Sequence, residues 1–128
     1  MTQRLLGATL TLACVAAFGG VAAAHHSQPG FDSNDKPIVQ KGTVAEYRWR
    51  NPHVLIFWDV KDDSGNVVRW VGEFGSVTSS IARGMNKTTF KVGEELTVTG
   101  IPAHAGTPVM QIRKVVKADG TLVTGNPE

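Results

Sequence analysis

At residues 48–60 the chain reads RWRNPHVLIFWDV, in which a proline turn leads into the strongest strand signal of the sequence. Pro52 has no N–H for a sheet ladder and keeps Asn51 in an extended or turn conformation. After the turn, apolar side chains alternate with others at Val54, Ile56, Trp58 and Val60. This is the period of a strand that buries one face. We therefore expect a strand from His53 to Val60, directly after a turn that carries one of the four histidines.

The next segment, residues 61–66, predicts a hairpin with a defined register. A type I turn at Asp63-Ser64, followed by Gly65 in the left-handed conformation, forms a three-residue loop with a glycine bulge. This loop sets Asp59 opposite Arg69, a favourable cross-strand charge pair. A two-residue loop at Ser64-Gly65 would shift the register by one residue and mix the two faces of the hairpin.

The bulged register separates the hairpin into two chemically distinct faces. The apolar face comprises Val54, Ile56, Trp58, Val60, Val68, Trp70 and Phe74. The opposite face carries His53, Asp59, Arg69 and Glu73. Core packing is therefore the expected role of Trp58 and Trp70, whereas His53 and Glu73 are expected to lie near each other on the outer face.

Three further strands are predicted from alternating or β-branched residues, at residues 38–49, 95–101 and 108–116. A short helix is predicted at residues 76–84, with Ser76 as N-cap, Val77 and Ile81 facing the core, and Gly84 at its end. A turn at residues 118–121 follows the last strand.

Three strands, a helix and two strands is the element order of the OB-fold. We therefore expect an all-β protein, a small five-stranded OB-like antiparallel barrel with one short helix between strands 3 and 4. Gly42, Gly72 and Gly100 fall inside predicted strands, where a small barrel must bend. An open β-sandwich, or a meander with the helix packed beneath it, is the alternative architecture.

The N-terminus has the pattern of an export signal. A short basic start is followed by an apolar run and by Ala22-Ala23-Ala24, so residues 1–24 are expected to be a cleaved signal peptide. A membrane anchor and a lipoprotein modified at Cys14 are the alternatives. We further expect a flexible arm at residues 25–37, a single barrel domain at 38–123 and a C-terminal tail at 124–128. The protein would then be periplasmic or secreted, without a membrane span in the mature chain.

Charge and motifs exclude several classes of function. Removal of residues 1–24 leaves 104 of the 128 residues, with 12 basic and 11 acidic side chains and no cysteine. Such a balance gives no reason to expect nucleic acid as a partner. The sequence has no nucleophile elbow, phosphate loop or cysteine-based metal motif, so an enzyme is the less favoured interpretation.

The histidines are the candidate metal ligands. Cleavage after Ala24 would leave an α-amine on His25 that can chelate a metal together with its own imidazole. Cleavage after Ala23 would instead place His26 third in the chain, where its imidazole, the amine and two backbone nitrogens can surround the metal. Copper(II) prefers such tetragonal nitrogen sites. We expect a copper site formed by His25, His26, His53 and Glu73, unless the first two histidines are simply solvated residues of the arm.

Two alternatives use the same part of the chain differently. His53 and Glu73 could act as a base and its orienting carboxylate, with Glu46 as a third partner. Without a metal, the protein could bind an exported partner or a small ligand through Trp49, Asn51, Glu46 and the outer face of strands 1–3. His104 is expected to be an exposed loop residue.

Several segments of the chain resemble an uncharacterised family of small exported bacterial domains. They are His25-His26-Ser27, Gly42-Thr43-Val44, Trp49 to His53, Trp70, Glu73, Arg83-Gly84, Val92 to Gly100 and Asp119 to Leu122. The resemblance implies a periplasmic or secreted domain, and it carries no substrate or cofactor with it. Gln28 and Met85 depart from the family pattern, which has an aromatic residue and a tryptophan at these places.

Overall fold

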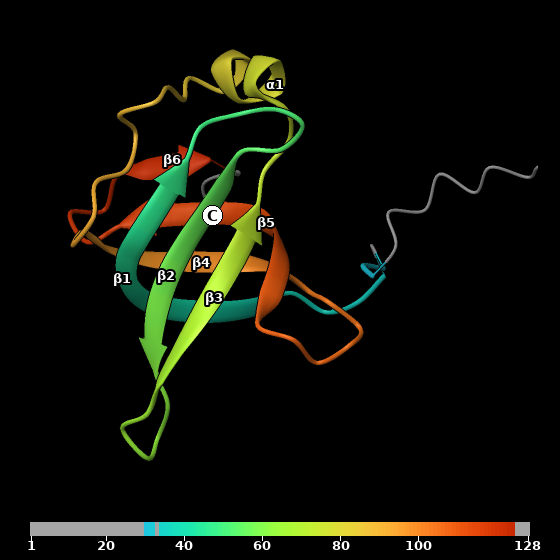
Figure 1. Ribbon diagram of the computed structural model, residues 1–128, viewed down its shortest axis with the longest axis vertical. Helices are drawn as coiled ribbons and strands as arrows, with labels where there is room; N and C mark the ends of the chain where they lie inside the picture. Colours follow the sequence, from blue (N-terminus) through green and yellow to red (C-terminus); the bar gives the residue numbers. More distant parts are fainter. Residues whose placement is uncertain (1–29, 33, 125–128) are drawn as a thin grey trace, which may run out of the picture.

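The computed structural model describes residues 30–32 and 34–124, which form a small β-barrel with one helix (Figure 1). The elements in chain order are β1 (Ile38–Arg48), β2 (Leu55–Lys61), β3 (Val67–Glu73), α1 (Val77–Ala82), β4 (Glu95–Pro102), β5 (Val109–Lys117) and β6 (Leu122–Thr124). No helix among these residues is long and apolar enough to span a membrane.

The barrel is closed by one parallel strand pair. The sheet order is β3-β2-β1-β4-β5-β6, with antiparallel neighbours, and a parallel pairing of β3 with β5 closes the ring. β1 is long enough to pair with both β2 and β4, and Thr43 has a partner in each. The all-β barrel with a helix between the third and fourth strands is thus confirmed, and the closing pair makes the barrel mixed.

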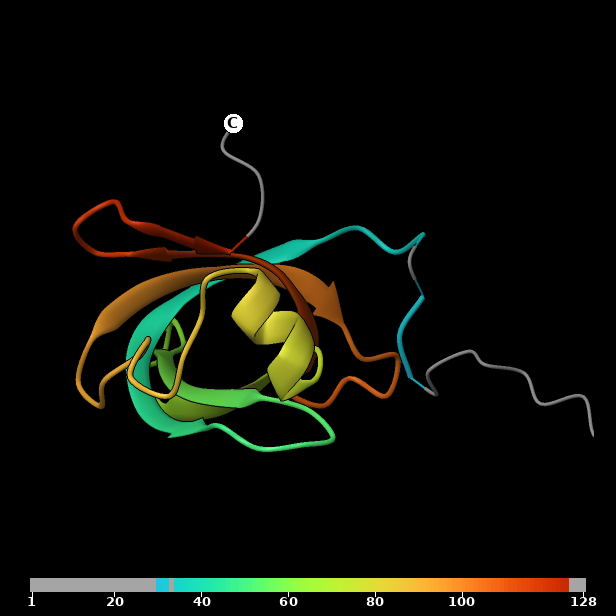
Figure 2. The same ribbon diagram turned by 90° about the horizontal axis from the view of Figure 1, so that it is seen from above.

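β3 ends at Glu73, and α1 follows it from Val77. Seen from above, α1 lies across one end of the barrel (Figure 2). The turn between β2 and β3 lies at the opposite end (Figure 1). Residues 49–54, which connect β1 to β2, therefore share their end of the barrel with the helix, and this end holds the predicted site.

The interior of the barrel is filled by side chains from every strand of the closed ring and from the segment after the helix. Trp58 and Val54 are fully buried, as the alternation predicts. Trp70 stacks on Trp58 with ring centroids 6.3 Å apart. Among the described residues, the other buried apolar side chains are Val44, Ile56, Phe74, Met85, Phe90, Leu96, Val98, Ile101, Met110, Ile112 and Val115.

The hairpin has the predicted register. The backbone N–H of Gly65 donates to the Asp62 carbonyl, the N–H of Asp62 donates to Asn66, and Gly65 has φ +84°. Asp59 lies opposite Arg69 in the ladder, and two guanidinium hydrogen bonds of 2.7 and 2.9 Å join their side chains. Turn chemistry and alternation therefore fix this part of the fold locally.

The Asp59–Arg69 pair predicts a measurable pH dependence. Hydrogen bonds from Arg69 hold the pKa of the Asp59 carboxyl below its ordinary value. The pair therefore stabilises the fold above the ordinary carboxyl pKa, and this contribution is lost as pH falls through the lowered folded pKa. We expect Arg69→Gln to return the pKa of Asp59 toward its ordinary value, measured by NMR titration of the carboxyl carbon. An unchanged pKa of Asp59 in Arg69→Gln would show that another group sets it.

Two details of the predicted elements are wrong. Ile81 is 59 % exposed rather than directed inward, and Ser80 is the helical side chain that is buried. The six residues of α1 make fewer than two turns, which is too short for a reliable helical period. β6 was not predicted as a strand, because three residues show no periodicity; it pairs with β5 after a turn at Gly120.

Candidate functional site

His53 and Glu73 meet at the end of the barrel that carries α1. Leu55 pairs with Glu73 across β2 and β3, and His53 precedes Leu55 by two residues, so the two side chains share one face. Nδ1 of His53 contacts Oε1 of Glu73. The imidazole side chain is 40 % exposed and the carboxylate side chain 24 % exposed. A carboxylate in contact with Nδ1 orients the ring, and Nε2 is then the ring nitrogen that can bind a metal or exchange a proton.

The loop that carries His53 is anchored to the start of the helix. The side-chain oxygen of Asn51 accepts a hydrogen bond of 3.0 Å from the backbone N–H of Val77. The backbone N–H of Val54 donates to the Gly75 carbonyl at 3.0 Å. The Asn51-Pro52 peptide bond is cis. Asn51 therefore acts as a structural link between this loop and α1. Hydrogen bonds of Asn51, before His53, and of Val54, after it, fix the backbone on both sides of His53.

Trp49 and Glu46 do not join the His53–Glu73 pair. Trp49 packs against the hydrophobic core beside Tyr47, with ring centroids 6.0 Å apart. Burial raises the pKa of Tyr47 to about 12, and its phenol donates a hydrogen bond to the Asn86 carbonyl. Glu46 binds the guanidinium of Arg48 at 2.7 Å. Trp49 is thus partly buried against the core, and the Glu46 carboxylate already forms an ion pair with Arg48.

The other three histidines are His25, His26 and His104. His25 and His26 lie outside the described residues. His104 is exposed, as expected, and its Nε2 lies 3.5 Å from Oδ2 of Asp35. Asp32 is close as well, so that one ligand atom from each of these three side chains lies within 4.8 Å of the others. The acidic neighbours of His104 are far away in sequence, and only the folded chain reveals them.

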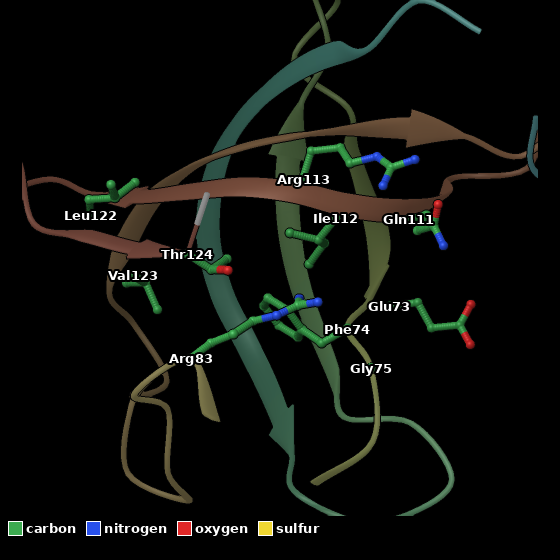
Figure 3. A pocket seen from close by; sticks show the side chains of 10 residues that line it. All are labelled: Glu73, Phe74, Gly75, Arg83, Gln111, Ile112, Arg113, Leu122, Val123 and Thr124. Atoms are coloured by element: carbon green, nitrogen blue, oxygen red, sulfur yellow. The ribbon is translucent and has the colours of Figure 1, made fainter. Parts of the chain in front are cut away.

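A cavity of about 620 Å³ opens beside Glu73 (Figure 3). Its wall comes from the end of β3 and the residues after it, the end of α1, β5 and β6. The residues that line it are Glu73, Phe74, Gly75, Arg83, Gln111, Ile112, Arg113, Leu122, Val123 and Thr124. Apart from Glu73, none of them was a predicted site residue.

The comparison with protein families assigns the chain. A model described as a family of unknown function (DUF6152) matches residues 11–111. The chain belongs to this family. The match confirms the resemblance to an uncharacterised family, and it covers β1 to β4 and the first residues of β5. The sequence matches no curated protein.

The cavity could not have been found by local patterns. Arg83 follows the helix and Arg113 lies thirty positions later in β5, next to the buried Ile112. The alternation in β5 predicts only that Arg113 points away from the barrel interior. That both arginines line one cavity with Glu73 follows from the parallel β3–β5 pairing and from the placement of α1.

Proposed function

We propose that the protein is an exported, non-enzymatic binding domain for a divalent metal ion, with copper(II) as the metal. The observation that carries this proposal is the contact between Nδ1 of His53 and Oε1 of Glu73. Histidine ligands of metals commonly donate their other ring N–H to a carboxylate, which fixes the tautomer and raises the basicity of the ligand nitrogen. Nε2 of His53 would be the ligand, and the exposure of the side chain gives solutes access to it.

His25 and His26 supply the remaining nitrogen ligands in this proposal. Their support comes from the sequence, because both follow directly after the expected signal cleavage site. An α-amine and one or two imidazoles, together with Nε2 of His53, form a nitrogen-rich ligand set. Such a set binds copper(II) more tightly than the other first-row divalent metal ions. Glu73 would then act mainly through His53, since its Oε1 is engaged by the imidazole.

The test is a copper(II) titration of exported, processed protein whose N-terminus is defined by mass spectrometry. We expect His53→Ala to weaken the affinity by about tenfold or more and to change the EPR spectrum. Glu73→Gln keeps the size of the side chain and removes its charge, and we expect about a tenfold weaker affinity, as for other carboxylates that orient a ligating histidine.

His104→Ala is the matched control, because it removes an exposed histidine that also lies beside a carboxylate. It should leave the copper affinity and the spectrum unchanged. Wild-type affinity and spectrum in His53→Ala would mean that only a solvent-exposed terminal chelate binds copper, and the proposal would be wrong. A loss confined to His104→Ala would also contradict it and would move the site to Asp32, Asp35 and His104.

A further inference from the structure

The cavity beside Glu73 is of a size that small molecules occupy. Its volume of about 620 Å³ falls within the range of known ligand sites, roughly 300–1,000 Å³. Half of the ten residues that line it are polar or charged, and the other half are apolar residues and one glycine. Phe74 and Ile112 are buried core residues at its base, and Leu122 and Val123 from β6 are half-buried beside them.

The charges of the cavity are not balanced. Arg83 and Arg113 both line it, and neither forms an ion pair with any residue in the described parts of the chain. Arg48 and Arg69, on the outer face of the barrel, are by contrast paired with Glu46 and Asp59. Within the part of the chain that the structure describes, the cavity thus presents two guanidinium groups without an anionic partner.

Figure 3 shows how these groups are arranged. The side chain of Arg83 extends from the helix end toward Phe74, and that of Arg113 extends along β5 toward Gln111. Glu73 lies at the edge of the same space, where its carboxylate is already in contact with His53. Two cationic side chains therefore line the cavity, and its one anionic lining residue, Glu73, already has a partner.

We infer that this cavity binds an organic carboxylate, a small molecule with one carboxylate group on an apolar body. The planar guanidinium group donates two parallel hydrogen bonds to a carboxylate, which adds both energy and orientation. The apolar body would cover Phe74, Ile112 and the β6 side chains, where burial of carbon surface contributes about 25 cal/mol per Å².

A multiply charged anion fits this cavity less well. The Glu73 carboxylate at the edge repels added negative charge, and an inorganic phosphate has no carbon surface to cover the apolar wall. A singly charged ligand with an apolar part matches both features. The cavity shares Glu73 with the proposed copper site, but neither arginine belongs to the proposed ligand set, so the arginines test this inference without altering the copper ligands.

The test is an NMR titration of ¹⁵N-labelled protein that has been treated with EDTA to remove metal. Benzoate and hexanoate are the probes, because they carry the same carboxylate on an aromatic and an aliphatic body. We expect at least one of them to shift amide resonances of Gly75, Ile112 and residues 122–124 saturably. Benzylamine, which has a similar body and the opposite charge, should cause no such shifts, and inorganic phosphate should bind at least about fivefold more weakly.

Arg83→Gln and Arg113→Gln each remove one guanidinium group and should weaken binding of the probe by about fivefold or more, a modest value because both side chains are exposed. Arg69→Gln removes an arginine outside the cavity and is the matched control, with unchanged affinity expected. Spectra that match the wild type away from the cavity verify that each variant is folded.

Three results would overturn the inference. They are the absence of saturable shifts with both acids, equal binding of benzylamine or phosphate, and unchanged affinity in both cavity variants. Because metal is removed beforehand and His53 is left intact, the outcome does not depend on whether copper binds. Failure of the copper titration with success here would leave a carboxylate-binding domain without a metal, and the reverse result would leave a metal-binding domain alone.

Discussion

Replacing Trp58 with alanine is expected to lower the free energy of unfolding by about 3–5 kcal/mol, the usual cost of removing a large aromatic side chain from a core. The indole is fully buried and stacks on Trp70. Its ring also lies against the backbones of two strands, because a Cβ added to Gly42 or to Gly72 would come within 2.9 Å of it. Both β1, which contains Gly42, and β3, which contains Gly72, therefore pack against this side chain. The cavity left by alanine could not close without moving these strands.

Urea denaturation followed by far-UV circular dichroism measures this effect. Val67→Ala removes a side chain that is 58 % exposed, and it should change the stability by no more than about 0.5 kcal/mol. Trp58→Phe should cost less than Trp58→Ala, because it keeps a ring and removes an indole N–H that is buried without a hydrogen-bond partner in the described structure. A loss below about 1 kcal/mol in Trp58→Ala would contradict the central position of this residue.

Gly42→Val is expected to be the second most damaging change, with a loss of about 2–3 kcal/mol or a failure to fold. A Cβ at this position would overlap the backbone carbonyl oxygen of Asp59 in β2 and would lie 2.9 Å from Cδ1 of Trp58. A backbone group in a ladder cannot move aside as a flexible side chain can. The strands would have to separate where β1 curls from one side of the barrel to the other.

The same denaturation experiment compares Gly42→Val with Thr43→Val, which adds the same side chain at the exposed neighbouring position. We expect Thr43→Val to stay within about 0.5 kcal/mol of the wild type. Equal stabilities of the two variants would show that the close approach of β1 and β2 is relaxed without cost, contrary to this expectation.

Local chemistry explains why the hairpin was predictable. The alternation from Val54 to Val60 sets which face is buried, and Gly65 permits a single compact turn. Together they fix the pairing of Asp59 with Arg69. The approach of His53 to Glu73 follows from the same register, so half of the proposed metal site was readable from residues 53–73 alone.

Other features depend on contacts between distant segments. His104 meets Asp35 across almost seventy residues, and Arg83 shares a cavity with Arg113 because β3 and β5 pair in parallel. Within α1, the short length of the helix let tertiary packing decide that Ser80 rather than Ile81 is buried. None of these arrangements has a signature within one strand or turn.

The sequence by itself determined the all-β class, the order of strands and helix, the hairpin register and the pairing of His53 with Glu73. These follow from side-chain period and turn geometry, which act over a few residues. Only the tertiary structure decided the parallel closure of the barrel, the anchoring of the Asn51 loop to α1, and the cavity that brings Arg83 and Arg113 together. Closing a ring of strands brings together residues whose separation along the chain carries no periodic signal, and the packing of the whole core selects which of them meet.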